Sequence, residues 1–145
     1  MRARIQPSAR RRKTQAGNAI VEISLCLTAL ILIMFGIVEY SRLMYAFNFV
    51  SYAARSASRY ASLHGSSSAS PVTQAEMTTY VQALAVALNS SQLVVNTTWS
   101  GSASPGNSPG NTVQVVVTYT ETPLLTLVMP NALAVTSTSQ MVVLQ

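Results

Sequence analysis

The chain has 145 residues, of which 9% are charged and 49% are hydrophobic. This length suits one small domain with an appendage, and the apolar composition excludes a disordered, solvating protein. The formal net charge of +5 arises at the N-terminus, because six of the nine basic residues lie within residues 1–17. The rest of the chain has three arginines and four glutamates, a net charge of −1. We therefore expect no nucleic-acid partner.

Residues 1–17 form a basic, polar segment that contains Pro7 and has no apolar periodicity, so we expect it to be unstructured by itself. The character of the sequence then changes abruptly. Residues 23–38 contain no charged residue, and Glu22 is the one charge within residues 18–38. At 1.5 Å per residue, about twenty residues cross the ~30 Å hydrocarbon core of a bilayer. The apolar run therefore has the length of a membrane span.

Three interpretations compete for residues 18–38: a cleaved secretory signal, a buried core helix and a permanent membrane span. A secretory signal has a shorter apolar region followed by extended chain, whereas here neither Pro nor Gly occurs between Val38 and Gly65. A core helix of a soluble protein is not normally apolar on every face. We therefore expect a permanent span. The basic residues before it, and the few behind it, orient its N-terminus toward the cytoplasm.

The helix is expected to continue beyond the membrane, over residues 18–63. Its second half is amphipathic, since Arg55 and Arg59 share a face at spacing i, i+4. A stripe of small residues recurs at helical spacing: Ala46, Val50, Ala53, Ala57 and Ala61. Small residues permit close approach of helices, so the last three are candidates for lateral packing between subunits. Packing against the protein's own sheet explains the stripe equally well.

Residues 64–145 predict a small domain outside the membrane. The turn-rich sequence GSSSASP at residues 65–71 separates it from the long helix. Thr73 followed by Glu76 has the pattern of a capping box. The apolar positions behind it follow a helical period, which predicts a helix of about fifteen residues that ends near Asn89.

The apolar period then changes to two, which predicts three strands, at residues 93–99, 113–119 and about 133–144. Ser-Pro-Gly-Asn occurs twice between the first two strands, at residues 104–107 and 108–111, and predicts two successive type II turns. The predicted fold class is therefore α+β, with a long N-terminal helix, a second amphipathic helix and a small antiparallel sheet of about three strands.

Catalytic and metal-binding patterns are sparse. The chain has no Asp, one His (His64) and one Cys (Cys26). His64 falls at the expected end of the long helix, where we expect a capping or exposed role, and Cys26 lies within the apolar run as a small hydrophobic residue. Catalysis and metal binding need several convergent side chains. We therefore expect no enzymatic activity, no metal site and no cofactor.

Glu22 breaks the apolar pattern, since a carboxylate about four residues inside a membrane helix is unfavourable. Two explanations are open. In one, the side chain reaches the water at the headgroups. In the other, a partner supplies the compensating charge. If the chain is cut after Gly17, the new α-amino group of Asn18 on a neighbouring subunit would neutralise Glu22 when helices pack side by side.

Gly17 followed five residues later by Glu22, behind basic residues and ahead of an apolar helix, resembles a type IV prepilin leader. Residues 17–61 are similar to the TadE-like family of tight-adherence pilus systems. Asn18 is more polar than the usual first residue of type IV pilins, a departure that concerns N-methylation of the new N-terminus. Ile23 follows Glu22 where the small major pilins of these systems tend to have Tyr, which favours a minor pilin or pseudopilin. The similarity rests on Ala19, Val21, Glu22, Phe35, Gly36, Glu39, Arg42, Leu43, Ala53, Ala54, Arg55, Arg59, Tyr60 and Ala61.

The resemblance implies a structural role and a pilin-like fold. Gly17 would precede the prepilin-peptidase cut, Asn18 would become the new N-terminus, and Glu22 would be the assembly glutamate. The precursor would be a single-pass protein of the inner (cytoplasmic) membrane with an extracytoplasmic C-terminal domain, and would enter a pilus or prime its assembly. The implied partners are the prepilin peptidase, the inner-membrane platform with its cytoplasmic ATPase, and other pilin-like subunits.

Other functions are open at this stage. In one alternative, the protein is an uncleaved single-span anchor whose outer domain binds a ligand or an envelope partner. The apolar loop between Pro123 and Pro130 would then be a contact surface, and Glu22 would lie at the membrane interface. It would be a pseudopilin of a secretion system if it acts as a piston. An anchored enzyme is the third alternative, and the absence of Asp together with a single His argues against it.

Overall fold

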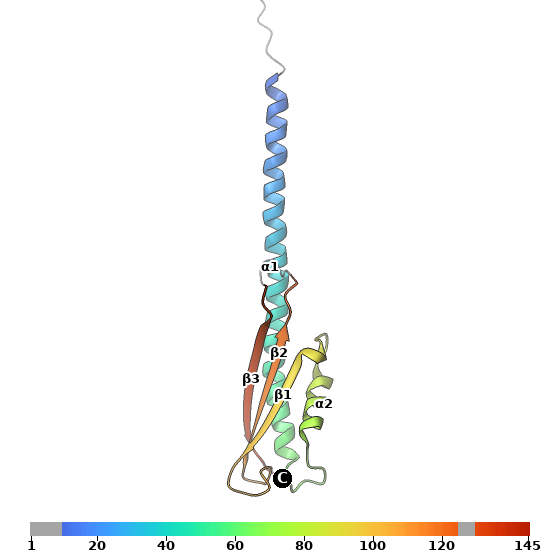
Figure 1. The fold of residues 1–145 in the computed structure, drawn as a ribbon, viewed down its shortest axis with the longest axis vertical. Helices are drawn as coiled ribbons and strands as arrows, with labels where there is room; N and C mark the ends of the chain where they lie inside the picture. Colours follow the sequence, from blue (N-terminus) through green and yellow to red (C-terminus); the bar gives the residue numbers. More distant parts are fainter. Residues whose placement is uncertain (1–9, 125–129) are drawn as a thin grey trace, which may run out of the picture. The chain divides into compact units, whose positions relative to one another are not determined.

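The computed structural model describes residues 10–124 and 130–145 (Figure 1). Most of the apolar loop after Pro123 lies outside the described residues. The internal contacts divide the chain into two units, one up to Val38 and one of residues 39–145. The long helix, the shorter second helix and the antiparallel three-stranded sheet confirm the predicted α+β class. The elements are α1 (Arg10–Leu63), α2 (Gln74–Leu84), a short 3₁₀ helix η1 (Ser90–Gln92), β1 (Leu93–Ser100), β2 (Thr112–Glu121) and β3 (Leu133–Val142).

Helix α1 begins at Arg10 rather than at Asn18, so the prediction of an unstructured N-terminal segment was wrong for residues 10–17. Arg, Lys, Gln and Ala are good helix formers, and neither Pro nor Gly occurs in residues 10–16. Adding turns to an existing helix requires little free energy, because nucleation is the unfavourable step. The predicted end at Leu63 is confirmed.

The first unit contains the apolar part of α1. Residues 18–38 are exposed on every face within the chain, and none of the most apolar window is buried. The helix is long and apolar enough to span a membrane. Because it is unburied, it is not a core helix of this chain. Because α1 continues without a break through residues 39–63, the extended chain that a secretory cleavage site requires is not found there.

The second unit is built on an antiparallel sheet with the strand order β1–β2–β3. The central strand β2 pairs with β1 in the register Val95↔Val117 and with β3 in the register Val117↔Ser137. Burial along β2 alternates strictly, as the period of two in the sequence predicts. The three predicted strands are confirmed, although β3 ends at Val142 rather than at Leu144.

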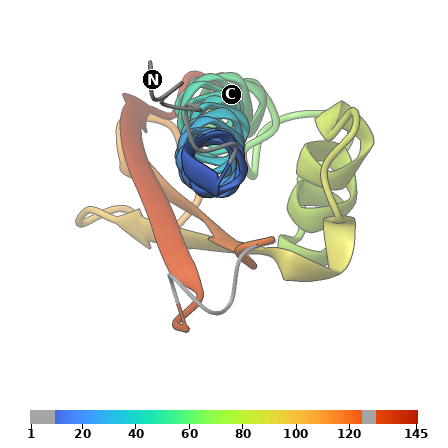
Figure 2. The ribbon, with the colours of Figure 1, turned by 90° about the horizontal axis from the view of Figure 1, so that it is seen from above.

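The core of the second unit lies between this sheet and the second half of α1. Figure 2 shows the sheet and α2 on one side of this part of the helix. Ser58 on α1 and Ser139 on β3 also join across the layers, with their hydroxyl oxygens 2.8 Å apart. Small side chains allow the helix to approach the sheet closely. The fully buried small-residue stripe packs in one cluster with the inward side chains of β2: Ala46, Val50, Ala53, Ala57, Ala61, Val113, Val115 and Val117.

Helix α2 begins at the predicted capping box. The Thr73 backbone N–H donates to Glu76 Oε2 at 2.8 Å, and the Glu76 N–H donates to the Thr73 hydroxyl at 3.3 Å. The helix ends at Leu84 rather than near Asn89. Ala87 has a φ of 62°, which a right-handed helix does not allow. Asn89 instead caps η1, because its side chain accepts a hydrogen bond from the backbone N–H two residues later.

The loop between β1 and β2 contains one of the two predicted type II turns. At the second Ser-Pro-Gly-Asn, the Asn111 N–H donates to Ser108 O at 3.1 Å and Gly110 has a φ of 87°, as a type II turn requires. The first predicted turn was wrong, because Gly106 lacks a positive φ. The Asn111 side chain determines the loop there, since its Nδ2 donates to Gly106 O at 2.9 Å.

Candidate processing and assembly site

The three candidate processing and assembly residues lie on one uninterrupted helix in the first unit. Gly17, Asn18 and Glu22 all belong to α1, and each is exposed within the chain. A Cβ built on Gly17 meets no atom within 4 Å. Asn18 and Glu22 share a face at spacing i, i+4, about 6 Å apart along the helix axis. The described part of the chain therefore leaves this face open to another protein.

Apolar side chains surround Glu22 on its own helix. A shallow surface around it is lined by Ile23, Cys26, Leu27 and Leu30. Among the side chains that the structure describes, no cation pairs with the Glu22 carboxylate. A carboxylate in hydrocarbon is stabilised only by a compensating charge or by water. Compensation for the Glu22 carboxylate would therefore come from headgroup water or from a second molecule, and not from a described side chain of this chain.

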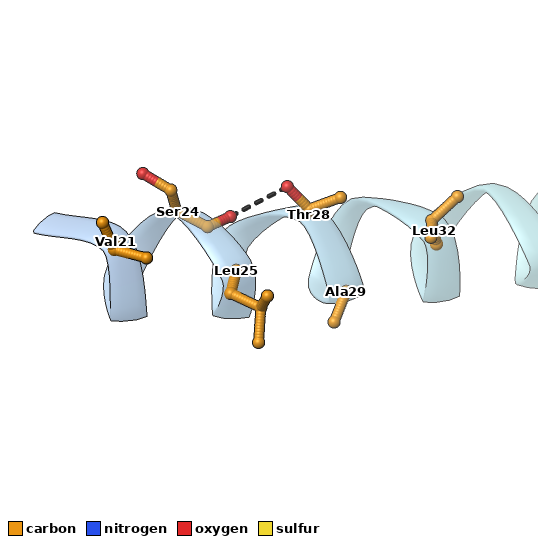
Figure 3. Close-up of a pocket in the computed structure, with 6 residues that line it drawn as sticks. All are labelled: Val21, Ser24, Leu25, Thr28, Ala29 and Leu32. Atoms are coloured by element: carbon orange, nitrogen blue, oxygen red, sulfur yellow. Dashed lines mark hydrogen bonds between the residues drawn. The ribbon is translucent and has the colours of Figure 1, made fainter.

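A neighbouring face of the span carries two hydroxyl groups that are satisfied within the helix (Figure 3). Ser24 Oγ donates to Ile20 O at 2.8 Å, and Thr28 Oγ1 donates to Ser24 O at 2.8 Å. The remaining side chains of this shallow surface, Val21, Leu25, Ala29 and Leu32, are apolar. This face is therefore compatible with hydrocarbon, because its polar groups already have hydrogen bonds.

A polar cluster that the sequence did not predict joins the end of β2 to α1. Arg42 Nη2 forms an ion pair with Glu121 Oε1, and Arg42 Nη1 lies 3.6 Å from Glu39 Oε2. Leu124 N donates to Glu39 Oε1 at 3.2 Å. The Glu121 side chain is only 6% exposed. The i, i+3 spacing of Glu39 and Arg42 is visible in the sequence, whereas the contribution of Glu121 depends on the register of β2.

Tyr119 places its hydroxyl group in a buried environment near the end of β2. Burial of the Tyr119 side chain raises the pKa of its hydroxyl above the ordinary value of 10.0, and the neighbouring Glu121 carboxylate adds to this effect. The Tyr119 hydroxyl donates to Gln92 Oε1 at 3.2 Å. The hydroxyl is therefore protonated at neutral pH and acts as a donor to the end of η1.

The one histidine caps α1, in agreement with the expectation for it. His64 Nδ1 lies 2.8 Å from Tyr60 O, and the two rings stack with centroids 4.1 Å apart. Cys26 is a free thiol on the exposed apolar part of the helix. Within residues 10–124 and 130–145, no group of three or more His, Cys, Asp or Glu residues could hold a metal ion.

The candidate residues for lateral helix packing lie inside the core. Ala53, Ala57 and Ala61 are 0% exposed and contact the sheet of their own chain. They are not available to another helix while the sheet covers them. The structure therefore supports the second explanation of the stripe, in which it packs within the chain.

Comparison with known families identifies the segment that contains the site. Residues 17–59 match the family model described as TadE-like protein. This segment is TadE-like. The match begins at Gly17 and includes Asn18 and Glu22, so it confirms the resemblance on the residues where the site lies. The β-rich residues lie outside the match, and no curated protein or solved structure matches the chain.

Proposed function

We propose that this protein is a non-enzymatic minor pilin or pseudopilin of a tight-adherence pilus. The TadE-like match supports a pilus-associated protein in general, because that family belongs to tight-adherence systems. One observation carries the finer proposal. The match begins at Gly17, with Glu22 five residues later and an exposed apolar helix behind it.

In this proposal a prepilin peptidase cuts between Gly17 and Asn18. Removal of residues 1–17 takes away six positive charges, which would otherwise hold the N-terminus at the cytoplasmic face. The cut lies within α1, so the helix must open locally for the peptidase to bind an extended chain. Opening near the end of a helix requires little free energy.

The new α-amino group then pairs with Glu22 of a neighbouring subunit in the membrane. Both charges are unfavourable in hydrocarbon when they are alone, and both are stabilised when the helices pack in the correct register. A subunit in a wrong register would leave both charges unpaired. The inner-membrane platform and its ATPase would move the subunit from the membrane to the pilus, together with other pilin-like subunits.

Substitution of Glu22 tests this function in cells that make the cognate pilus. Glu22→Gln keeps the size of the side chain and removes its charge. We expect the variant to remain in the membrane and the yield of sheared pili to fall at least about tenfold, because the unpaired α-amino group would disfavour packing of the helices. Ser24→Ala is the matched control, because the Ser24 hydroxyl bonds only to its own helix. An unchanged pilus yield with Glu22→Gln would contradict the proposal.

A further inference from the structure

The two edges of the sheet differ in how their backbone groups are satisfied. On β1, Gln74 Nε2 donates to Val95 O at 2.6 Å, and the Thr97 N–H donates to Gln74 Oε1 at 3.0 Å. One side chain of α2 thus occupies the place of a neighbouring strand. Along β3, in the part of the chain that the structure describes, no side chain takes this role. Figures 1 and 2 show β3 as the outer strand on the side of the sheet away from α2.

The alternation of an antiparallel ladder identifies the open backbone groups of β3. The Val143 N–H donates to Asn111 O at 2.8 Å, so Val143 and every second residue before it face β2. The backbone N–H of Leu144 points away from β2, since it donates to Ser62 O of α1 at 2.9 Å. The intervening residues direct their N–H and C=O groups away from the sheet. These residues are Ala134, Thr136, Thr138, Gln140 and Val142.

The sequence of β3 lacks the features that usually protect an edge strand. Natural edges are protected by charged residues, Pro, bulges or short length. The ten residues LAVTSTSQMV contain neither a charge nor a Pro. An edge of this kind is a template for another strand, because it offers a regular row of donors and acceptors.

A groove lies between the C-terminal end of β3 and α1. Its volume is about 310 Å³. Its apolar side chains are solvent-exposed, with Leu63 at 39% and Leu144 at 65%. An added strand beside β3 would cover these apolar groups. The groove is lined by Arg59, Ser62, Leu63, Met141, Val142 and Leu144.

The charge beside this groove is positive and without compensation in the described residues. Arg59 and Arg55 lie one turn apart on α1, and no described carboxylate pairs with either of them. The three glutamates of the second unit are already engaged, two with Arg42 and one in the capping box of α2. The surface is therefore complementary to an acidic partner.

We propose that the free edge of β3 binds an extended, acidic segment of another protein. The segment adds to the sheet as a fourth strand, places apolar side chains in the groove and directs a carboxylate toward Arg59. A second copy of this chain is a poorer partner, because pairing two β3 edges would bring together the arginines of both copies and no unpaired glutamate of the second unit. The inference rests on the edge, the groove and the unpaired arginines beside it, and it holds whether or not the chain enters a pilus.

Peptide selection tests this proposal even though the natural partner is unidentified. A phage-displayed library of random ten-residue peptides is selected on the full chain in detergent micelles. We expect enriched peptides to alternate apolar and polar residues and to carry Asp or Glu. Enrichment of peptides without this pattern, or of none above empty micelles, would overturn the proposal, as would dimerisation of the chain through β3 in the absence of peptide.

Matched variants then test the two contacts with the most enriched peptide. Thr138→Pro removes an outward N–H that β2 does not use, and Thr138→Val keeps that N–H. Arg59→Glu reverses the charge, and Arg59→Lys keeps it. We expect Thr138→Pro and Arg59→Glu to raise the Kd at least about tenfold, and each control to change it less than about threefold. Equal affinities for all four variants would overturn the proposal.

Amide hydrogen exchange of the unsubstituted chain gives a readout that does not depend on the folding of a variant. Bound peptide should slow the exchange of Thr136, Thr138 and Gln140. Ser137 and Ser139 should not change, since their N–H groups already bond to β2. Protection of all five residues alike, or of none, would contradict strand addition.

Discussion

The ion pair between Arg42 and Glu121 makes the fold of the second unit sensitive to a single substitution. The Glu121 side chain is almost completely buried, whereas Arg42 is 38% exposed. Arg42→Ala leaves a buried carboxylate without its cation, and we expect the free energy of unfolding to fall by about 2–3 kcal/mol, below the roughly 3–5 kcal/mol of a fully buried pair. Urea unfolding of the full chain in micelles, followed by Trp99 fluorescence, measures this change.

Arg55→Ala is the matched control for this prediction. Arg55 is exposed and has no ion-pair partner among the described residues, so its loss should change the free energy of unfolding by less than about 0.5 kcal/mol. Equal losses for the two variants would show that the buried ion pair has no special role.

The capping box of α2 predicts a pH dependence. Hydrogen bonds from the Thr73 backbone and hydroxyl lower the pKa of Glu76 below its ordinary value of 4.5. Such a group stabilises the fold above its unfolded pKa, and this contribution is lost as the pH falls through the folded pKa. We therefore expect Glu76→Gln to be less stable than the unsubstituted chain at pH 7, and the difference to disappear in acid. Thermal unfolding from pH 7 to pH 3 checks this prediction, and parallel profiles would contradict it.

Gly65 lies where no side chain fits. A Cβ at this position would overlap Gln145 O and would lie 2.5 Å from Val143 Cγ1 and 2.6 Å from Asn107 O. Gly65→Ala should therefore lower the free energy of unfolding by about 1–3 kcal/mol, as overpacking does elsewhere. Gly106→Ala is the matched control, because a Cβ there would lie 3.5 Å from Trp99 Cβ, an ordinary van der Waals contact. The same urea titration measures both variants, and equal stabilities would contradict the close approach at Gly65.

At the scale of elements, α1 can pack closely against the sheet because the helix side chains at this contact are small. Ala57 is fully buried, so Ala57→Leu should force the helix and the sheet apart and lower the free energy of unfolding by about 1–3 kcal/mol. Asn48→Leu places the same side chain on the exposed face of α1 and should have little effect. If only Asn48→Leu destabilised the chain, the assignment of the core face would be wrong.

Sequence patterns correctly predicted those features of the fold that residues close together in the sequence determine. The Thr73–Glu76 capping box and the alternation along β2 were predicted correctly, because each depends on residues within one turn or one strand. The end of α2 was not, since Leu88 keeps the helical period although Ala87 has left the helix. The role of Glu121 was not predicted either, because it depends on where β2 ends beside α1.

The residues of the candidate site were predicted from the sequence, but the start of the helix that holds them was not. The shared face of Asn18 and Glu22 follows from their i, i+4 spacing, and Gly17 precedes Asn18 on the same helix. The helical start at Arg10 does not follow from the sequence, because the pattern of residues 10–17 is polar on all sides and gives no periodic signal. The free edge of β3 also could not be predicted, since it depends on which edge Gln74 covers.

At the scale of the whole molecule, the two units have opposite requirements for solvent. Residues 18–38 expose only one charged side chain, Glu22, among apolar ones, whereas residues 39–145 bury a core of their own. The first unit is compatible with a bilayer and the second with water. In the proposed function, removal of the basic segment before Asn18 prepares the first unit for assembly.

The most direct test of this central claim is the mass of the membrane-extracted protein, made with and without its cognate prepilin peptidase. We predict that the peptidase removes residues 1–17 and leaves an N-terminus at Asn18. We also predict that the leader stays intact without the peptidase. An intact leader in the presence of an active cognate peptidase would contradict the proposed processing and would leave a single-span anchored protein.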